Sequence, residues 1–381
     1  MPTLPWQALA SPLHDPEAVR ALAEPWRDML VACGATEQPE QAAEHPLALL
    51  LLTGGTEALA LRIHERRPSR ALLLLAHGAH NSLPAALETL AALRQRGAAA
   101  MLVLLDGPGD PAEHLRRGLH AVHAHRRLLG ARLGLIGGAS SWLVASRPGP
   151  ELVLERWGPL VVEIPMAELM DRLPVETDID AERVHAALSE LVIRHRLDAF
   201  TLRCFDLLTA RATTACLAMA RMGQAGLPAG CEGDLPSAVA LLWVRELLGT
   251  VPWMANPARI EDRGLWLAHC TVPLQLVADH TLDTHFESGL GVGVAGRFEP
   301  QPVTLLRIGG ASLEDLWVVE TAILEAGSAS DQCRTQALVA LEPEQCASLL
   351  ERPLGNHIVL VPGHHRGVLE RYHRCLGPGR C

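Results

Sequence analysis

The stretch that decides the predicted fold is ALLLLAHGAHNS, residues 71–82, an apolar run that ends in a polar loop containing glycine. A helical pattern follows over residues 84–96, and a second apolar run covers residues 100–105. Upstream, residues 47–52 form a similar run that ends in a glycine-rich loop at residues 53–56. Apolar strands that alternate with helices and end in polar loops are typical of a parallel sheet. We therefore predict an α/β fold for the first third of the chain.

The texture of the sequence changes twice further along. A second α/β unit is predicted to start near residue 132, with strands at residues 133–136, 152–156 and 160–164 and a helix at residues 181–195. The last third has several short apolar runs with few helical patterns between them, as in a barrel or sandwich. We predict two doubly wound α/β domains followed by a β-rich, barrel-like domain that carries metal ligands, at residues 1–131, 132–226 and 227–381.

Composition excludes several classes of function. Of the 381 residues, 49% are hydrophobic and 20% charged, which predicts a large core and little disorder. The net charge of −10 argues against a nucleic-acid partner. All 33 residues counted as Lys or Arg are Arg, so chemistry that needs a lysine, such as a Schiff base or a phosphate-loop lysine, is excluded. Tyr372 is the only tyrosine, so Tyr-Lys hydride-transfer machinery is excluded as well.

Cysteine usage and hydropathy bear on the location of the protein. The nine cysteines include no Cys-x-x-Cys pair, and residues 1–5 do not read as a signal peptide. We expect free thiols in a reducing cytoplasm. The longest apolar run, residues 47–52, is far too short to span a bilayer, so no membrane partner is expected.

The segment GLPAGCEGDL, residues 226–235, places two carboxylates two residues apart behind small residues. On extended backbone, Glu232 and Asp234 would point to the same face. Two like charges so near to each other are unfavourable unless a cation or a shared proton offsets them. The segment therefore indicates a divalent metal site, a proton-transfer site or both, and a solvated turn is the alternative.

A second segment supports a metal site. Gly355-Asn356-His357 opens an apolar run, so His357 is predicted to lie at a strand edge beside small residues. An imidazole in that position is a good metal ligand, although a lone histidine is more often a surface or hydrogen-bonded residue. We interpret the two segments together as parts of one site.

Several short motifs follow one another along the C-terminal half of the chain. They are Cys231-Glu232-Gly233-Asp234, His269-Cys270-Thr271-Val272-Pro273, Thr284-His285-Phe286-Glu287-Ser288, Val303-Thr304-Leu305, and Gly355-Asn356-His357 with Gly363. The N-terminal part contains the loops Asn81-Ser82-Leu83-Pro84 and Gly137-Gly138-x-Ser-x-Trp142. In this order the motifs resemble the L-fucose/L-arabinose isomerase family, in its shorter fucose-isomerase-like branch. The resemblance covers most of the chain, and the motifs of the C-terminal half are its more specific part.

The resemblance implies a metal-dependent sugar isomerase, an intramolecular oxidoreductase that is a homo-oligomer. Its metal, usually Mn²⁺, would be held by two carboxylates and one histidine, which fall on Asp234, His357 and an upstream carboxylate. Asp206 is the nearest candidate for the upstream carboxylate, but it could instead cap a helix, in which case Glu232 would supply the missing oxygen.

The implied reaction is an aldose–ketose interconversion through an enediolate, with the cation polarising the sugar carbonyl. Asp234 and Asp206 are the predicted acid/base pair, with Glu232 in reserve. The predicted substrate-binding residues are His269, His285, Glu287, Ser82 and Trp142. Two other functions stay open: a metal-dependent lyase of the class II aldolase type, and a sugar-binding relative without catalysis.

Overall fold

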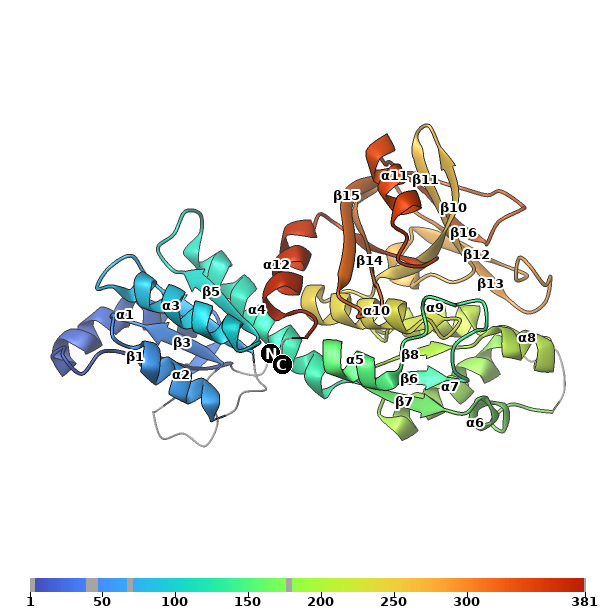
Figure 1. Cartoon of the computed structure of the whole chain (residues 1–381). Helices are drawn as coiled ribbons and strands as arrows, with labels where there is room; N and C mark the ends of the chain where they lie inside the picture. The colour runs from blue at the N-terminus through green and yellow to red at the C-terminus, as the bar shows by residue number, and fades with distance from the viewer. Residues whose placement is uncertain (1–3, 39–46, 67–70, 176–179, 380–381) are drawn as a thin grey trace. The chain divides into compact units, whose positions relative to one another are not determined.

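The computed structural model describes residues 4–38, 47–66, 71–175 and 180–379 (Figure 1). The chain divides into two compact units, Met1–Arg127 with Arg371–Cys381, and Leu128–Glu370. The predicted fold class is confirmed, because the chain contains parallel α/β sheets and a closed antiparallel β-barrel in its C-terminal region. Within the described ranges, no helix is both long and apolar enough to cross a membrane.

The first unit contains a five-stranded parallel sheet in the order β2-β1-β3-β4-β5. Residues 71–82 contribute β4, in which all five residues are buried, and then the turn into helix α3. Apolar residues of α2 and α3 pack with the strands in one core. The elements are β1 (Leu4–Leu9), α1 (Pro16–Ala32), β2 (Ala35–Glu37), β3 (Ala48–Leu51), α2 (Glu57–Glu65), β4 (Leu72–Ala76), α3 (Ser82–Gln95), β5 (Ala100–Leu104) and α4 (Pro111–Gly130).

The second unit begins with a four-stranded parallel sheet in the order β7-β6-β8-β9. Its strands are β6 (Arg132–Ile136), β7 (Leu160–Ile164), β8 (Ala199–Leu202) and β9 (Ala229–Cys231). Its helices are α5 (Pro150–Trp157), α6 (Met166–Met170), α7 (Ala181–His195), α8 (Phe205–Arg211), α9 (Cys216–Gln224) and α10 (Leu235–Leu248).

One predicted strand of this unit is wrong, because residues 152–156 lie in helix α5. Pro150 occupies the first turn, where its missing N–H costs nothing, and Gly158 ends the helix in the left-handed region at φ 93°. Val153 and Trp157, one helical turn apart, are the buried residues of the helix. The capping residues and the four-residue apolar spacing therefore favour a helix more strongly than the short apolar run favours a strand.

The barrel consists of six antiparallel strands in the order β10-β11-β16-β15-β14-β17, and β17 closes it by pairing with β10. Closure removes free strand edges, and the inward-facing apolar residues form one core. The elements are β10 (Trp253–Glu261), β11 (Gly264–His269), the short helix η1 (Leu274–Leu276), the hairpin β12 (Asp279–Asp283) with β13 (Gly293–Arg297), β14 (Gln301–Gly309), β15 (Asp315–Ala326), β16 (Thr335–Val339), α11 (Pro343–Glu351), β17 (Ile358–Pro362) and α12 (Arg366–Leu376).

Helix α10 joins the parallel sheet to the barrel within the second unit (Figure 1). It contacts strands β6, β8 and β9 as well as β14 and β17, and every residue from 235 to 244 is buried. A helix that is apolar all round is buried on all sides. The chain leaves β9, turns at Glu232 and Gly233, and enters α10 at Asp234, so this turn lies beside the barrel.

Candidate metal centre

Three buried side chains of the second unit have the composition and spacing of a metal site. Ligand atoms of Glu232, His269 and His357 all lie within 4.8 Å of one another. Glu232 follows β9, His269 ends β11, and His357 immediately precedes β17. Strand β10 pairs with β11 on one side and with β17 on the other, which brings the two histidines together. The barrel thus supplies both imidazoles, and the turn after the parallel sheet supplies the carboxylate.

The two carboxylates of the Glu-x-Asp segment lie on either side of one imidazole. Asp234 Oδ2 lies 2.9 Å from His357 Nδ1, and Glu232 Oε1 lies 3.6 Å from His357 Nε2. This differs from the extended segment that was predicted, because Glu232 and Gly233 both adopt left-handed backbone, at φ 65° and 75°. A Cβ atom on Gly233 would lie 2.2 Å from the carbonyl oxygen of Gly138, so this tight turn needs glycine.

Asp234 is fully buried, and its carboxylate oxygens contact other groups of the protein. It caps helix α10 by accepting a hydrogen bond from Ser237 N at 2.7 Å, and it forms an ion pair with buried Arg307 at 3.0 Å. Burial alone would raise the pKa of Asp234, but Arg307 and the hydrogen bond with His357 lower it to about 2. The structure therefore places Asp234 behind His357, away from the pocket, where it orients the imidazole.

The protonation states follow from these neighbours. Burial alone would lower the pKa of His357, yet Asp234 and Glu232 raise it to about 9. Burial would raise the pKa of Glu232, but His357 and the hydrogen bond from Trp142 hold it below its usual value. Burial lowers the pKa of His269 to about 4, so this imidazole is neutral at pH 7. Without a cation, the group is thus a carboxylate, an imidazolium and a neutral imidazole.

The donor set fits a divalent cation. Within the described part of the chain, neither Nε2 of His357 nor Nδ1 of His269 has a hydrogen-bond partner, although both atoms are buried. Buried polar atoms are normally paired, so two orphaned imidazole nitrogens beside a carboxylate suggest a missing partner. One carboxylate and two imidazoles suit several first-row divalent metals. The Asp234–His357 hydrogen bond is the outer contact that metal-binding histidines commonly make.

A pocket of about 550 Å³ opens beside this group, with Glu232 and His269 in its lining. One wall is aromatic. The ring of Phe205 lies edge-on to the rings of Trp142 and His285, with ring centroids 5.0 Å and 5.6 Å apart. Trp142 also donates a hydrogen bond from Nε1 to Glu232 Oε2 at 2.6 Å. The pocket therefore combines a polar floor with a wall suited to the apolar faces of a small molecule.

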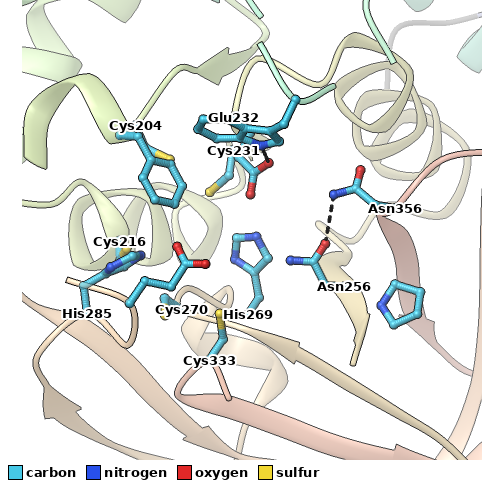
Figure 2. Close-up of a pocket in the computed structure, with 14 residues that line it drawn as sticks. Cys204, Cys216, Cys231, Glu232, Asn256, His269, Cys270, His285, Cys333 and Asn356 are labelled. Atoms are coloured by element: carbon cyan, nitrogen blue, oxygen red, sulfur yellow. Dashed lines mark hydrogen bonds between the residues drawn. The ribbon is translucent and has the colours of Figure 1, made fainter. Parts of the chain in front are cut away.

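Figure 2 shows the polar side chains that complete this pocket. Asn356 donates a hydrogen bond to Asn256 Oδ1 at 3.3 Å, and both amides lie on the same side of the pocket as His269. His285, Glu287 and Trp142 line the pocket together with His269, so four of the five predicted substrate-binding residues are brought together. Asn256 and Phe205 were not predicted, because nothing in their local sequence distinguishes them from ordinary strand and loop residues.

Two predicted site residues neither contact this group nor line the pocket. Asp206 is in the first turn of α8, and its Oδ2 accepts hydrogen bonds from Arg203, with Nε at 2.8 Å. Ser82 belongs to the first unit, where its hydroxyl accepts a hydrogen bond from His77 N and donates one to the carbonyl oxygen of Leu51. The third member of the group is instead His269, which was predicted to contact substrate hydroxyls. The only feature of the sequence that could have indicated His269 as a metal ligand is its position at the end of a predicted strand, beside a cysteine.

Cysteines are concentrated at this pocket. Of the eight cysteines in the described part of the chain, five line it, and in two pairs one thiol shifts the pKa of its neighbour: Cys204 that of Cys231, and Cys333 that of Cys270. The neighbouring thiol of Cys333 is the main reason that the pKa of Cys270 falls to about 7, whereas Cys204 and burial raise the pKa of Cys231. Cys231 and Cys270 therefore interact with neighbouring thiols and are not merely small apolar side chains.

Comparison with known proteins adds no family assignment. No protein-family model matches the sequence, and no curated protein matches it. The family resemblance therefore stays a prediction.

Proposed function

We propose that this protein is a divalent-metal-dependent aldose–ketose isomerase that acts on a neutral, fucose- or arabinose-like sugar through an enediolate. The observation that carries the proposal is the group of Glu232, His269 and His357 beside the pocket, with Glu232 and His269 in its lining. Mn²⁺ is the cation suggested by the family resemblance, and another divalent cation would serve the same role. A homo-oligomer and a cytoplasmic location belong to the same proposal.

Glu232, His269 and His357 would hold the cation, which would act as a Lewis acid toward a carbonyl oxygen. Asp234 accepts a hydrogen bond from the Nδ1–H of His357, which leaves Nε2 as the ligand atom. Arg307 in turn holds the carboxylate of Asp234. Because His357 is an imidazolium without a cation, binding would release a proton from this site.

Proton transfer between two neighbouring carbons requires a base and an acid that reach the substrate. Asp234 is fully buried and Asp206 is paired with Arg203, so neither lines the pocket. Within the part of the chain that the structure describes, Glu232 and Glu287 are the carboxylates of the lining. The lowered pKa of Glu232 keeps it ionised at neutral pH, so we assign it the removal of the proton and Glu287 its return. This revises the acid/base pair predicted from the sequence.

The pocket lining supports a neutral substrate. None of the described residues that line it is an arginine, and the sequence contains no lysine. Phosphate and sulfonate groups are usually recognised by cationic side chains, so a sugar that carries one would find no partner in this lining. Asn256 and Asn356 offer amide donors and acceptors for hydroxyl groups, and the ring of Trp142 offers an apolar face.

The test is a panel of neutral aldoses incubated with the purified protein, with and without Mn²⁺, followed by product analysis. We expect a ketose of equal mass, formed only with the cation. Glu287→Gln should lose turnover and keep metal binding, whereas Glu232→Gln should lose both. Glu299→Gln, at an exposed site, is the matched control and should keep both.

The outcome separates the three functions. Two fragments from one sugar would indicate a lyase. Sugar binding without product at any cation concentration would indicate a non-catalytic relative. If the protein binds no divalent cation, the proposal fails at its first step.

A further inference from the structure

We propose that Ser146 is a positioning residue for the metal group, because its hydrogen bond with Arg307 holds the loop whose Trp142 supports Glu232. This loop, residues 137–149, connects β6 to α5 and is called the β6–α5 loop below. The role rests on the proposed metal site. Ser146 is buried and does not line the pocket, so it would act through other residues.

Arg307 joins three segments that are far apart in the chain. Its guanidinium donates hydrogen bonds to Asp234 Oδ2 at 3.0 Å, to the carbonyl oxygen of Leu354 at 3.3 Å and to Ser146 Oγ at 2.7 Å. The first segment begins α10, the second precedes His357, and the third is the β6–α5 loop. Arg307 and Ser146 are each 2% exposed, so water does not compete for the bond between them. One guanidinium therefore fixes the relative positions of all three segments.

A glycine makes this junction possible. Gly355 has φ 144°, and a Cβ atom on it would clash with Nη2 of Arg307 and lie 2.8 Å from Oγ of Ser146. A side chain at this position would separate the guanidinium and the hydroxyl from the segment that carries His357. The Gly-Asn-His motif thus places its glycine against the Arg307–Ser146 bond and its histidine in the metal group.

The β6–α5 loop supports Glu232 in turn. The backbone N–H of Ser140 donates to the carbonyl oxygen of Glu232 at 2.8 Å, and Trp142 Nε1 donates to its Oε2 at 2.6 Å. Trp142 itself is 50% exposed, so packing restrains its indole only in part. Its position therefore depends on the two anchors of the loop, Ser140 before it and Ser146 after it. Loss of the second anchor would let the indole move away from Glu232.

These hydrogen bonds support two members of the metal group from one residue. One branch runs from Arg307 through Asp234 to His357. The other runs from Arg307 through Ser146 and the β6–α5 loop to Glu232. Loss of a residue that orients a metal ligand lowers metal affinity by roughly 10- to 100-fold, and we expect a smaller loss, about fivefold, for Ser146 because it acts at one remove.

The tether is tested first on the metal-free, full-length protein by hydrogen exchange with mass spectrometry. Ser146→Ala should speed exchange at the backbone amides of residues 140–146, because the loop loses its buried anchor. Ser141→Ala, an exposed change in the same loop, is the matched control and should leave exchange unchanged. Unchanged exchange in the barrel strands would show that Ser146→Ala folds. If it does not fold, Ser146→Cys, which nearly keeps the volume but offers only a weak acceptor, takes its place.

Coupling to the metal group is tested by calorimetric titration of Mn²⁺. Ser146→Ala should weaken binding about fivefold, and Ser141→Ala should not change it. In the Trp142→Phe background, Ser146→Ala should have little further effect, because its influence passes through the indole. The EPR line shape of bound Mn²⁺ reports the symmetry of its ligands and should change in Ser146→Ala, whereas a loss of folding stability alone would not change it.

Three results would overturn the proposal: equal exchange rates in Ser146→Ala and Ser141→Ala, an unchanged Mn²⁺ affinity in Ser146→Ala, or additive losses in the double variant. The unmodified protein separates this failure from that of the isomerase proposal. If it binds no Mn²⁺, the isomerase proposal fails, and the role of Ser146 toward the metal fails with it. If it binds Mn²⁺ and the variants do not differ, only the role of Ser146 fails.

Discussion

The two parallel sheets carry similar polar loops at the carboxyl ends of their strands, but these loops have different surroundings. In the first unit, Ser82 and Asp106 are used by the loops themselves: the Ser82 hydroxyl joins residues 51 and 77, and Asp106 accepts from Gly78 N. In the second unit, the loop after β9 carries Glu232, and two histidines of the barrel lie beside it. Glycine-rich loops that look alike in sequence therefore become a candidate site only where a second element adds ligands.

The largest effect is expected from the buried ion pair. Asp234→Asn leaves the fully buried Arg307 without its charged partner, which should lower the free energy of unfolding by about 3–5 kcal/mol. The matched change in the first sheet, Asp106→Asn at an exposed loop, should cost about 1 kcal/mol. Urea unfolding of the two variants compares them directly. Equal losses would show that the carboxylate behind His357 has no special structural role.

The two units also differ in how they bury a histidine. The carboxylates of Asp234 and Glu232 raise the pKa of His357 to about 9. By contrast, burial lowers the pKa of His125, in helix α4 of the first unit, to about 4. The unfolded chain binds a proton at His125 below about pH 6.5, while the folded chain does not until about pH 4, so folding stability falls as the pH drops across that window. The loss amounts to roughly 3 kcal/mol.

Urea unfolding at pH 7 and pH 4.5 measures this loss of folding stability. His125→Gln should reduce the difference between the two pH values, because glutamine does not titrate. A variant with the same pH dependence as the unmodified protein would exclude His125 as its source.

The third prediction concerns metal binding. His269→Asn removes one of the three donors and should weaken Mn²⁺ binding by on the order of 100-fold, at least as much as the loss of an outer contact. His77→Asn, in the corresponding loop of the first sheet, should leave the affinity unchanged. Calorimetric titration of Mn²⁺ distinguishes them. An equal effect of both changes would remove the distinction between the two loops.

The smallest effect is expected from the aromatic wall. Trp142→Phe keeps an aromatic ring but removes the hydrogen bond to Glu232 Oε2, which should weaken metal binding and turnover by about tenfold. Leu154→Phe, at an exposed site outside the pocket lining, is a control for a general effect of changing a large side chain in this unit. Steady-state kinetics with the best aldose of the panel and a metal titration measure both quantities. Unchanged values would mean that Glu232 needs no support from the indole.

Much of the fold could be predicted because local patterns agree with it. Residues 71–82 form β4 and the following turn, and most of the short apolar runs of the last third form barrel strands. The pattern failed at residues 152–156, where an apolar run lies in helix α5 between capping residues. The long strand β10 was not predicted, because Pro257 and several exposed polar residues interrupt its apolar pattern.

The candidate site was predicted less completely. Glu232, Asp234 and His357 were expected to meet, and they do. Their order around the imidazole was not expected, since it depends on the left-handed turn at Glu232 and Gly233. His269 and the thiol pairs were not assigned to the centre, because strand pairing in a barrel joins residues far apart in the chain.

The sequence by itself determined the α/β and barrel composition, the absence of lysine chemistry and the residue types available for a metal site. These follow from periodicity and composition, which are local properties of the chain. Only the tertiary structure decided that Asp234 lies behind His357, that His269 joins Glu232, and that Cys270 and Cys333 line the same pocket. The physical reason is that these contacts depend on strand register and on the buried charge of Arg307, and neither is encoded within any one segment.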